Sequence, residues 1–352
     1  MVRIIKTSYA IFFLLFCTLI SYSQVNTDSL NRIVKKTPDD KKAEKCNLIA
    51  KDLLEANPDI SLKYTDMALK YAQKSKNSEQ ENYSYIYSGD AYANLNKHDK
   101  ANESYNKAIE NGHKVKDNNI VALAFLGLGE ICFYQGDYDK ALEQFKKSAE
   151  VAEKSTNNTV LSKALNDIGV ICKKRGLYSE ALSNYNKALK IDQDNVVLKS
   201  ISTDLNNIGA VYRTLGQYDK AIDFFKQALE IDLKLPLSLE LAIDYNNIGK
   251  AYYDKGFYDK ALENYLKTLE IYNKLNKKDY ISGILNNIAG VFQKCSKYDK
   301  AMEYYQKAFD LDKESNSEIN LAADLNNLAT LFFQMKNKNN NHCNQKRNTK
   351  KI

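Results

Sequence analysis

Residues 205–229 read LNNIGAVYRTLGQYDKAIDFFKQAL, and this stretch decides the fold. In its first half, apolar and small residues fall at the spacing of one helical face, at Leu205, Ile208, Gly209 and Tyr212. A second set with helical spacing follows, at Ala221, Ile222, Phe225, Ala228 and Leu229. Gly216 lies between the two sets, and glycine favours the left-handed conformation that ends a helix. The stretch therefore predicts two antiparallel helices joined by a tight turn.

This unit recurs at intervals of 40 residues along most of the chain. Positions equivalent to Gly209 indicate eight first helices, at Ile49, Gly89, Gly129, Gly169, Gly209, Gly249, Ala289 and Ala329. Positions equivalent to Ala221 indicate seven second helices, at Ser61, Ala101, Ala141, Ala181, Ala221, Ala261 and Ala301. One helix pair cannot bury its apolar face alone, so successive pairs must stack. The sequence predicts an all-α solenoid with seven full repeats and one unpaired helix.

The recurring pattern Leu-x-x-Ile-Gly-x-x-Tyr, followed by Gly-x-Tyr and Ala, resembles the tetratricopeptide repeat. The unit is six residues longer than the usual one of about 34, and it lacks the Trp and the closing Pro of that family. It is similar to the long repeats of kinesin light chains and of exported bacterial arrays that precede sensor kinases or regulators. The resemblance implies a right-handed superhelix of antiparallel helix pairs whose first helices line an inner wall. It also implies a partner that is a protein or an extended peptide.

Composition divides the chain into four segments. Residues 1–23 have the pattern of a secretory signal peptide, with Arg3 and Lys6 before an apolar run and cleavage expected near Ser23. Residues 24–40 predict an N-terminal capping segment, and residues 41–335 the repeat array. Residues 336–352 are rich in Asn and Lys and predict a disordered basic tail. We therefore expect an exported protein that lies in the periplasm or elsewhere outside the cytoplasm.

The membrane and nucleic-acid classes receive little support from the sequence. The apolar run at residues 9–20 is too short for a span of about 20 residues, and no later run is longer, so we expect no transmembrane segment in the mature chain. Lipidation at Cys17 is an alternative to simple cleavage. The net charge of +7 comes from the terminal segments, which hold eight Lys and Arg residues and no acidic residue. Residues 24–335 carry about −1, which argues against nucleic-acid binding.

Asparagine recurs at two adjacent positions of the first helices. The first position holds Asn166, Asn206, Asn246, Asn286 and Asn326, and the second holds Asp167, Asn207, Asn247, Asn287 and Asn327. Asn is a mediocre helix former, so a pair repeated in mid-helix needs a reason. One interpretation is an asparagine ladder that binds the backbone of an extended peptide, and the other is a hydrogen bond between repeats. We favour the first asparagine for the groove and the second for structure. The resemblance implies a groove role, because some tetratricopeptide proteins grip peptide backbones or terminal carboxylates with such asparagines.

Other side chains on the same inner wall complete a candidate binding groove. They are Lys163, Lys173, Arg213, Lys250, Tyr253 and Gln293. Such a mildly positive, aromatic-bearing groove suits an acidic segment or a terminal carboxylate, and the alternative is a solvated helix face. The three histidines are scattered along the chain and no metal-binding spacing occurs, so we predict no enzyme, no catalytic residue, no metal site and no cofactor.

The first helix of the eighth repeat has an apolar face, and no second helix follows it in the predicted pattern to cover this face. Its apolar residues are Leu325, Leu328, Leu331, Phe332 and Phe333. Two further hypotheses follow from this face. The chain could be the truncated sensory region of a bacterial signal-transduction regulator or histidine kinase, or it could self-assemble through Phe332 and Phe333.

Overall fold

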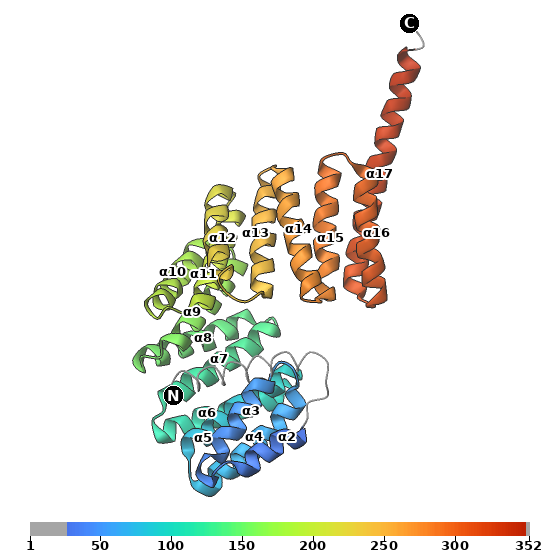
Figure 1. The fold of residues 1–352 in the computed structure, drawn as a ribbon. Helices are drawn as coiled ribbons and strands as arrows, with labels where there is room; N and C mark the ends of the chain where they lie inside the picture. Colours follow the sequence, from blue (N-terminus) through green and yellow to red (C-terminus); the bar gives the residue numbers. More distant parts are fainter. Residues whose placement is uncertain (1–26, 350–352) are drawn as a thin grey trace, which may run out of the picture. The chain divides into compact units, whose positions relative to one another are not determined.

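A computed structural model describes the backbone of residues 27–349 and the side chains of residues 27–336 (Figure 1). All regular secondary structure in this range is helical. The signal peptide that the sequence predicts at residues 1–23 lies outside the described residues. The described chain begins with α2 (Thr27–Lys36) and the short 3-10 helix η1 (Asp39–Lys41).

The remaining helices alternate between the first and the second helix of each repeat, here called A and B helices. The A helices are α3 (Lys42–Leu53), α5 (Ser78–Asn94), α7 (Asn118–Tyr134), α9 (Asn158–Lys174), α11 (Leu198–Thr214), α13 (Leu239–Asp254), α15 (Lys278–Lys294) and α17 (Glu318–Thr349). The B helices are α4 (Pro58–Ser75), α6 (His98–Val115), α8 (Tyr138–Lys154), α10 (Tyr178–Asp194), α12 (Tyr218–Asp232), α14 (Tyr258–Lys274) and α16 (Tyr298–Glu314). Within the described residues, the prediction of seven helix pairs and one unpaired A helix is confirmed.

The chain divides into two compact units, and the boundary between Ile171 and Cys172 lies inside α9. In the first unit, Leu30 and Val34 of α2 join the apolar core of the first helix pair. In the second unit, consecutive helices pack against each other from α10 to α17, and Figure 1 shows α13, α14, α15 and α16 standing side by side. None of the described helices is both long and apolar enough to cross a membrane.

On four A helices, a glycine receives an aromatic ring from the B helix of the same repeat. A Cβ atom added to Gly209 would lie 2.7 Å from the ring of Phe225, and one added to Gly249 would lie 2.6 Å from the ring of Tyr265. Gly89 and Gly129 meet Tyr105 and Phe145 in the same way. The small residue is therefore a packing requirement of the helix pair, because a side chain would displace a fully buried ring.

The turn within each repeat explains a second recurring glycine. Gly216 has a φ of 73°, in the left-handed region that side chains rarely adopt. Its backbone N–H donates to the carbonyl of Arg213 and that of Gln217 donates to Tyr212, which ends the A helix and directs the chain into the B helix.

Helix α17 differs from the other A helices in its exposure and its length. Leu325 and Phe332 are 55% and 59% exposed, whereas Leu285 and Phe292, at the same positions of α15, are 6% and 8% exposed. No described B helix follows to cover this face. The helix also continues to Thr349, whereas the sequence predicts a disordered tail from residue 336. Residues 336–349 contain no Gly or Pro that would end a helix.

Candidate functional site

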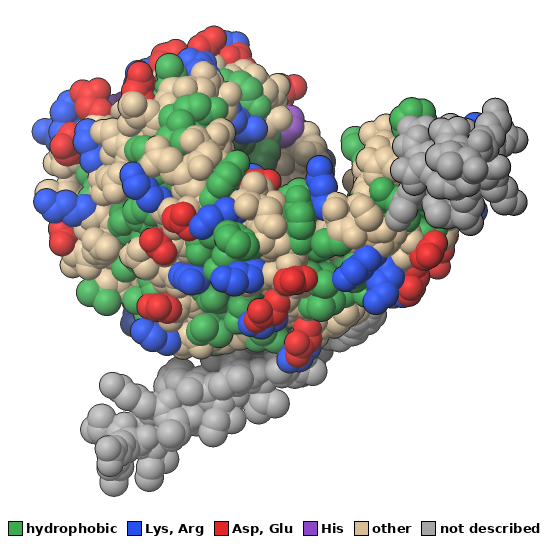
Figure 2. Space-filling view, turned by 90° about the horizontal axis from the view of Figure 1, so that it is seen from above, with side chains coloured by type: hydrophobic (Ala, Val, Ile, Leu, Met, Phe, Trp, Pro, Cys, Tyr) green, Lys and Arg blue, Asp and Glu red, His purple; other side chains and the backbone are tan. Residues whose placement is uncertain are grey.

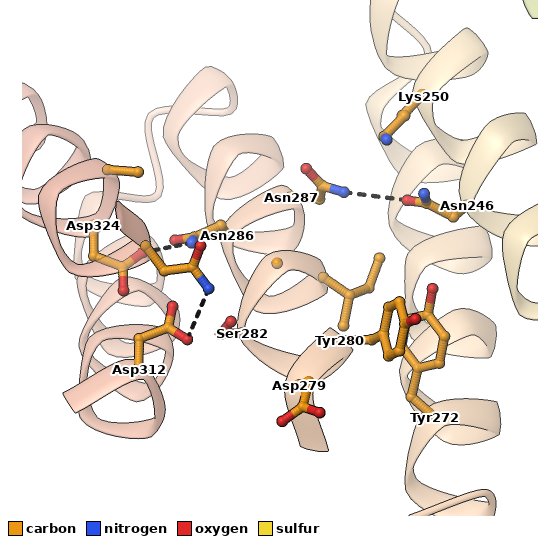
Figure 3. A pocket seen from close by; sticks show the side chains of 14 residues that line it. Asn246, Lys250, Tyr272, Asp279, Tyr280, Ser282, Asn286, Asn287, Asp312 and Asp324 are labelled. Atoms are coloured by element: carbon orange, nitrogen blue, oxygen red, sulfur yellow. Dashed lines mark hydrogen bonds between the residues drawn. The ribbon is translucent and has the colours of Figure 1, made fainter. Parts of the chain in front are cut away.

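The asparagine ladder of the second unit forms hydrogen bonds between neighbouring repeats. Asn247 Nδ2 donates to Asn206 Oδ1 at 3.0 Å. Asn287 Nδ2 donates to Asn246 Oδ1 at 3.2 Å (Figure 3). The second asparagine of one repeat thus holds the first asparagine of the repeat before it. Both asparagine positions therefore take part in bonds between repeats, and not the second position alone.

Two first-position asparagines also donate to a buried carboxyl group of the following A helix. Asn206 Nδ2 lies 2.5 Å from Asp244 Oδ1, and Asn286 Nδ2 lies 2.6 Å from Asp324 Oδ1. The position that holds Asp244 in α13 and Asp324 in α17 is occupied by Ile284 in α15. These two amide donors are consequently engaged inside the protein.

Asn246 is the first-position asparagine that faces Ile284 instead of an aspartate. Its Oδ1 accepts from Asn287, but its Nδ2 donates no hydrogen bond within the described residues. Asn246 is half-buried and one helical turn from Lys250 on the same face of α13. The replacement of an aspartate by Ile284 thus leaves the amide donor of Asn246 available to a ligand.

A hollow of about 430 Å³ lies against this amide, between α13, α15 and α17 (Figure 3). Its lining includes Asn246, Lys250, Tyr280, Asn286, Asn287 and Asp324. Tyr280 is 50% exposed, and its ring lies 5.3 Å from that of the buried Tyr272. The hollow therefore offers an exposed aromatic surface beside amide groups, a combination that suits an extended peptide.

Lys250 is a cation at the edge of this hollow. It forms no ion pair within the described residues. Burial lowers its pKa, and the charge of Arg213 lowers it further while Asp254 opposes the shift. Arg213 is itself bound to Asp254, with 3.0 Å between Nη1 and Oδ2. An anionic or carbonyl group of a ligand would supply the partner that the ammonium group of Lys250 lacks.

The predicted cations of the second unit lie close enough to influence one another. Burial lowers the pKa of Lys173, and the charges of Lys174 and Arg213 lower it further. The Arg213 charge acts on Lys250 in the same direction. The structure therefore brings together Lys173, Arg213 and Lys250 on the A helices of this unit. The charge of Arg213 is offset by Asp254, so Lys173 and Lys250 are the cations that suit an acidic or carboxylate-bearing segment.

The remaining predicted residues of the second unit have varied surroundings. The ring of Tyr253 packs 5.6 Å from that of Tyr258. Gln293 donates to Gln334 and accepts from the Tyr305 hydroxyl, so both ends of its amide bind within the protein. Asn207 is half-buried on α11, and Asn326 is exposed on α17.

The corresponding face of the first unit is acidic, which differs from the mildly positive groove that the sequence predicts there. Lys163 Nζ lies 2.5 Å from Glu130 Oε1. Burial and the nearby charge of Glu130 raise the pKa of Asp167 to about 7. Burial likewise raises the pKa of Asp90 to about 6, although Asp90 accepts a hydrogen bond from the Tyr105 hydroxyl at 2.6 Å. Lys163 is therefore already paired, and its neighbours would repel an acidic ligand. Asn166 of this unit is half-buried on α9.

Several of these groups do not stand out in the sequence alone. Asp90 and Glu130 each follow the recurring small residue of an A helix, and that position carries Lys250 in α13. When the A helices are aligned, the charge at this position distinguishes the acidic face of the first unit from the face of the second. On the face that Figure 2 shows, Lys and Arg side chains are interspersed with Asp and Glu. Among the described residues, no group of three or more His, Cys, Asp or Glu side chains is placed to hold a metal ion.

Comparison with known families gives a match over more than half of the chain. One model described as a tetratricopeptide repeat matches residues 120–194 and 201–277. A second model with the same description matches residues 84–111 and 282–315. No curated protein matches the sequence.

Solved structures of similar fold come from several kinds of protein. A Rap protein complexed with Competence and Sporulation Factor superposes with a TM-score of 0.60 at 16% identity, covering 85% of this chain and 88% of that one. A STAND signal-transduction ATPase with a tetratricopeptide repeat sensor, from Pyrococcus horikoshii, gives 0.59 at 17%, covering 84% of this chain and 50% of that one. BtubC (BKLC) from P. vanneervenii superposes with a TM-score of 0.55 at 21% identity, covering 61% of this chain and 91% of that one. At these identities the likeness concerns the fold.

Proposed function

The chain belongs to the tetratricopeptide repeat family, and we propose that it is a non-enzymatic scaffold that binds an extended peptide or a protein segment along the A helices of its second unit. The hollow between α13, α15 and α17 is the centre of this binding groove. The observation that carries the proposal is the free amide donor of Asn246 beside the unpaired ammonium group of Lys250.

The chemistry of the groove favours one orientation of ligand groups. Asn246 and Lys250 both offer hydrogen-bond donors, whereas Asn286 Oδ1 is buried without a hydrogen-bond partner. A peptide unit carries a carbonyl acceptor that fits the two donors, whereas the buried Asn286 Oδ1 is closed to a ligand. Lys173 extends the donor side toward an acidic side chain or a terminal carboxylate, whereas Arg213 is already bound to Asp254.

Export and a periplasmic or extracytoplasmic location are part of the proposal. They rest on the pattern of residues 1–23, where two basic residues precede an apolar run. The test is N-terminal sequencing of the chain recovered from the periplasmic fraction. A first residue near Gln24 supports the proposal, and a chain that stays in the cytoplasm with its first 23 residues intact contradicts it.

A second candidate function is a sensory role within a signalling system. One structure of similar fold is a STAND protein with a tetratricopeptide repeat sensor, and another is a Rap protein complexed with Competence and Sporulation Factor. Under this hypothesis the ligand of the groove is a signal, and the chain is an input region. A third candidate is self-association through α17, which the exposure of Phe332 and Phe333 favours.

The groove is tested by selecting peptides from a random library on the full chain and measuring their affinity for two double variants. Asn246→Ala with Lys250→Ala removes both free donors. Asn273→Ala with Lys274→Ala makes the same replacements at two exposed residues of α14. We expect the first variant to lose at least about tenfold in affinity. The neutral bond from Asn246 contributes about 0.5–1.5 kcal/mol and the charged bond from Lys250 about 1.5–3 kcal/mol. Equal affinity of the two variants would contradict the proposed groove.

A further inference from the structure

Two pairs of buried aspartates lie where a B helix is followed by the next A helix. Asp232 of α12 and Asp244 of α13 are 1% and 0% exposed, and Asp312 of α16 and Asp324 of α17 are 5% and 0% exposed. The members of each pair are twelve residues apart in sequence. The charge of Asp232 acts on Asp244 and that of Asp312 acts on Asp324, so the two carboxyl groups of each pair lie close together. Figure 3 shows the carboxyl groups of Asp312 and Asp324 facing one another.

The first pair has fewer hydrogen-bond donors than two carboxylates need. Asp232 Oδ2 accepts from the Ser202 hydroxyl at 2.7 Å, and Asp244 Oδ1 accepts from Asn206 Nδ2 at 2.5 Å. Asp244 Oδ2 is buried and has no hydrogen-bond partner. A buried carboxylate oxygen without a donor costs several kcal/mol unless the group is neutralised.

The second pair repeats this arrangement. Asp324 Oδ1 accepts from Asn286 Nδ2 at 2.6 Å, and Asp312 Oδ1 accepts from Asn320 Nδ2 at 3.2 Å. The Oδ2 atoms of both aspartates are buried without a partner. Each pair therefore brings two acidic oxygens together with too few N–H and O–H groups.

No cation compensates these charges. The charge of Glu240 of α13 acts on Asp244, and Lys199 of α11 is bound to Glu240 at 2.7 Å. Beside the second pair, Asp279 of α15 lines the same hollow as Asp312 and Asp324. Within the described residues, no Lys or Arg forms an ion pair with any member of the two pairs. Two adjacent buried carboxylates cannot both stay ionised under these conditions.

We propose that the Asp232–Asp244 pair and the Asp312–Asp324 pair each bind one proton, which the two carboxyl groups share and which fastens the B helix to the following A helix. The protonated carboxyl donates to its partner, and the single remaining negative charge accepts from the amide and hydroxyl groups already in place. The folded second unit thus has two proton-binding sites between helices, and their occupancy follows the pH of the compartment.

The residues at the equivalent positions of other helix junctions in the second unit indicate that the carboxyl pairs do more than fill space. Asp192 and Asp204 have the same spacing and are 3% and 1% exposed. At the junction of α14 and α15 the equivalent residues are Tyr272 and Ile284. That junction demonstrates that apolar side chains can fill the space, so the carboxyl pairs are not required for packing alone.

The pH dependence follows from the direction of the pKa shifts. Burial raises the pKa of Asp244 to about 8, with the charge of Asp232 acting in the same direction and the hydrogen bond from Asn206 opposing it. Burial also raises the pKa of Asp324. Because the folded pKa lies above the unfolded value of about 4, the stabilisation is complete below pH 4 and is lost as the pH rises toward 8.

The test is hydrogen exchange of the amides of α13 and α17 in the full chain, corrected for intrinsic rates, at pH 5 and pH 7. In the natural chain we expect the protection factors of these amides to fall by up to about 100-fold between pH 5 and pH 7. Each shared proton accounts for a fall of at most about tenfold per pH unit. Asp244→Asn with Asp324→Asn supplies the missing N–H donors at every pH, so the fall should largely disappear. Asp223→Asn with Asp310→Asn, on the exposed faces of α12 and α16, should behave like the natural chain. An equal fall in both double variants would overturn the proposal.

A second measurement covers the case in which the Asp244→Asn chain does not fold. Carbon-13 labelling of the aspartate carboxyl groups allows their titration to be followed by NMR in a full chain that carries Asp90→Asn and Asp167→Asn. These two replacements remove the carboxyl groups of the first unit whose pKa is raised by burial. The chain also carries Asp204→Asn, which removes the carboxyl pair of α10 and α11, and we expect aspartate resonances that still titrate above pH 6. Titration of every aspartate below pH 5 would contradict a shared proton.

Discussion

Asn287 Nδ2 donates a hydrogen bond of 3.2 Å to Asn246 Oδ1, so one repeat orients the amide group that the preceding repeat presents to the groove. The equivalent bond from Asn247 reaches Asn206, whose own Nδ2 is bound to Asp244. The two bonds have the same geometry but different consequences. Only the first holds an amide whose donor faces the hollow.

This difference predicts a selective effect of Asn287→Ala on ligand binding. Loss of the bond frees Asn246 to rotate, and we expect peptide affinity to fall about 3–10-fold, since one neutral hydrogen bond contributes about 0.5–1.5 kcal/mol. Asn247→Ala removes an equivalent bond away from the hollow and should leave affinity unchanged. Fluorescence anisotropy with a selected peptide measures both. An effect of similar size in the two variants would show that the bond acts through stability alone.

The packing of rings on small residues predicts opposite effects for two glycine substitutions. A Cβ atom at Gly249 would meet the Tyr265 ring at 2.6 Å, so Gly249→Ala should lower the free energy of unfolding by about 1–3 kcal/mol. A Cβ atom at Gly283 would have no atom within 4 Å, so Gly283→Ala should raise it by about 0.5–1 kcal/mol. Thermal unfolding followed by circular dichroism distinguishes the two. Destabilisation by Gly283→Ala would show that this glycine is needed for another reason.

Tyr105→Phe should destabilise the first unit in a pH-dependent way. The Tyr105 hydroxyl donates to Asp90, and burial raises the pKa of that carboxyl group to about 6. Above pH 6 the variant leaves a buried carboxylate without its donor, at a cost of about 1–3 kcal/mol, whereas below pH 5 the neutral acid tolerates the loss better. Urea unfolding at pH 4.5 and pH 7.5 measures the difference. Tyr134→Phe, on a ring 81% exposed, is the control and should have no effect at either pH.

Self-association through α17 predicts a change in mass when its apolar face is made acidic. Phe332 and Phe333 are 59% and 66% exposed; Phe332 lies at the position that is buried as Phe292 in α15, and Phe333 lies next to it, at the inner-wall position of Gln293. Light scattering of the natural chain should give a dimer, and Phe332→Asp with Phe333→Asp should give a monomer. A monomeric natural chain, or a variant of unchanged mass, would remove this hypothesis.

The helix pairs could be predicted from the sequence because their causes are local and repeated. Gly216 has a positive φ, Gly209 meets the ring of Phe225, and both recur every 40 residues. The end of α17 was harder to place, because residues 336–349 have no apolar periodicity and also no residue that stops a helix. Composition alone does not separate such a helix from a disordered tail.

The candidate site could be predicted only in part. The asparagine ladder is visible in the sequence, but the use of each amide depends on whether the next A helix carries Asp244 or Ile284 at the facing position. The sequence does show that Asp244 lies twelve residues after Asp232. This spacing indicates a buried pair only once α12 and α13 are known to pack together. The hollow beside Tyr280 depends on side-chain packing and leaves no pattern in the sequence.

The most direct test of the central claim is photo-crosslinking of a selected peptide to the full chain. A photoreactive phenylalanine derivative replaces Gly283, which lines the hollow with open space around it, or Leu266, which is 43% exposed on α14. If the peptide lies along the A helices of the second unit, the chain modified at position 283 will crosslink to it and the chain modified at position 266 will not. Crosslinking at position 266 alone, with peptide affinity retained in both chains, would place the ligand elsewhere and contradict the proposed groove.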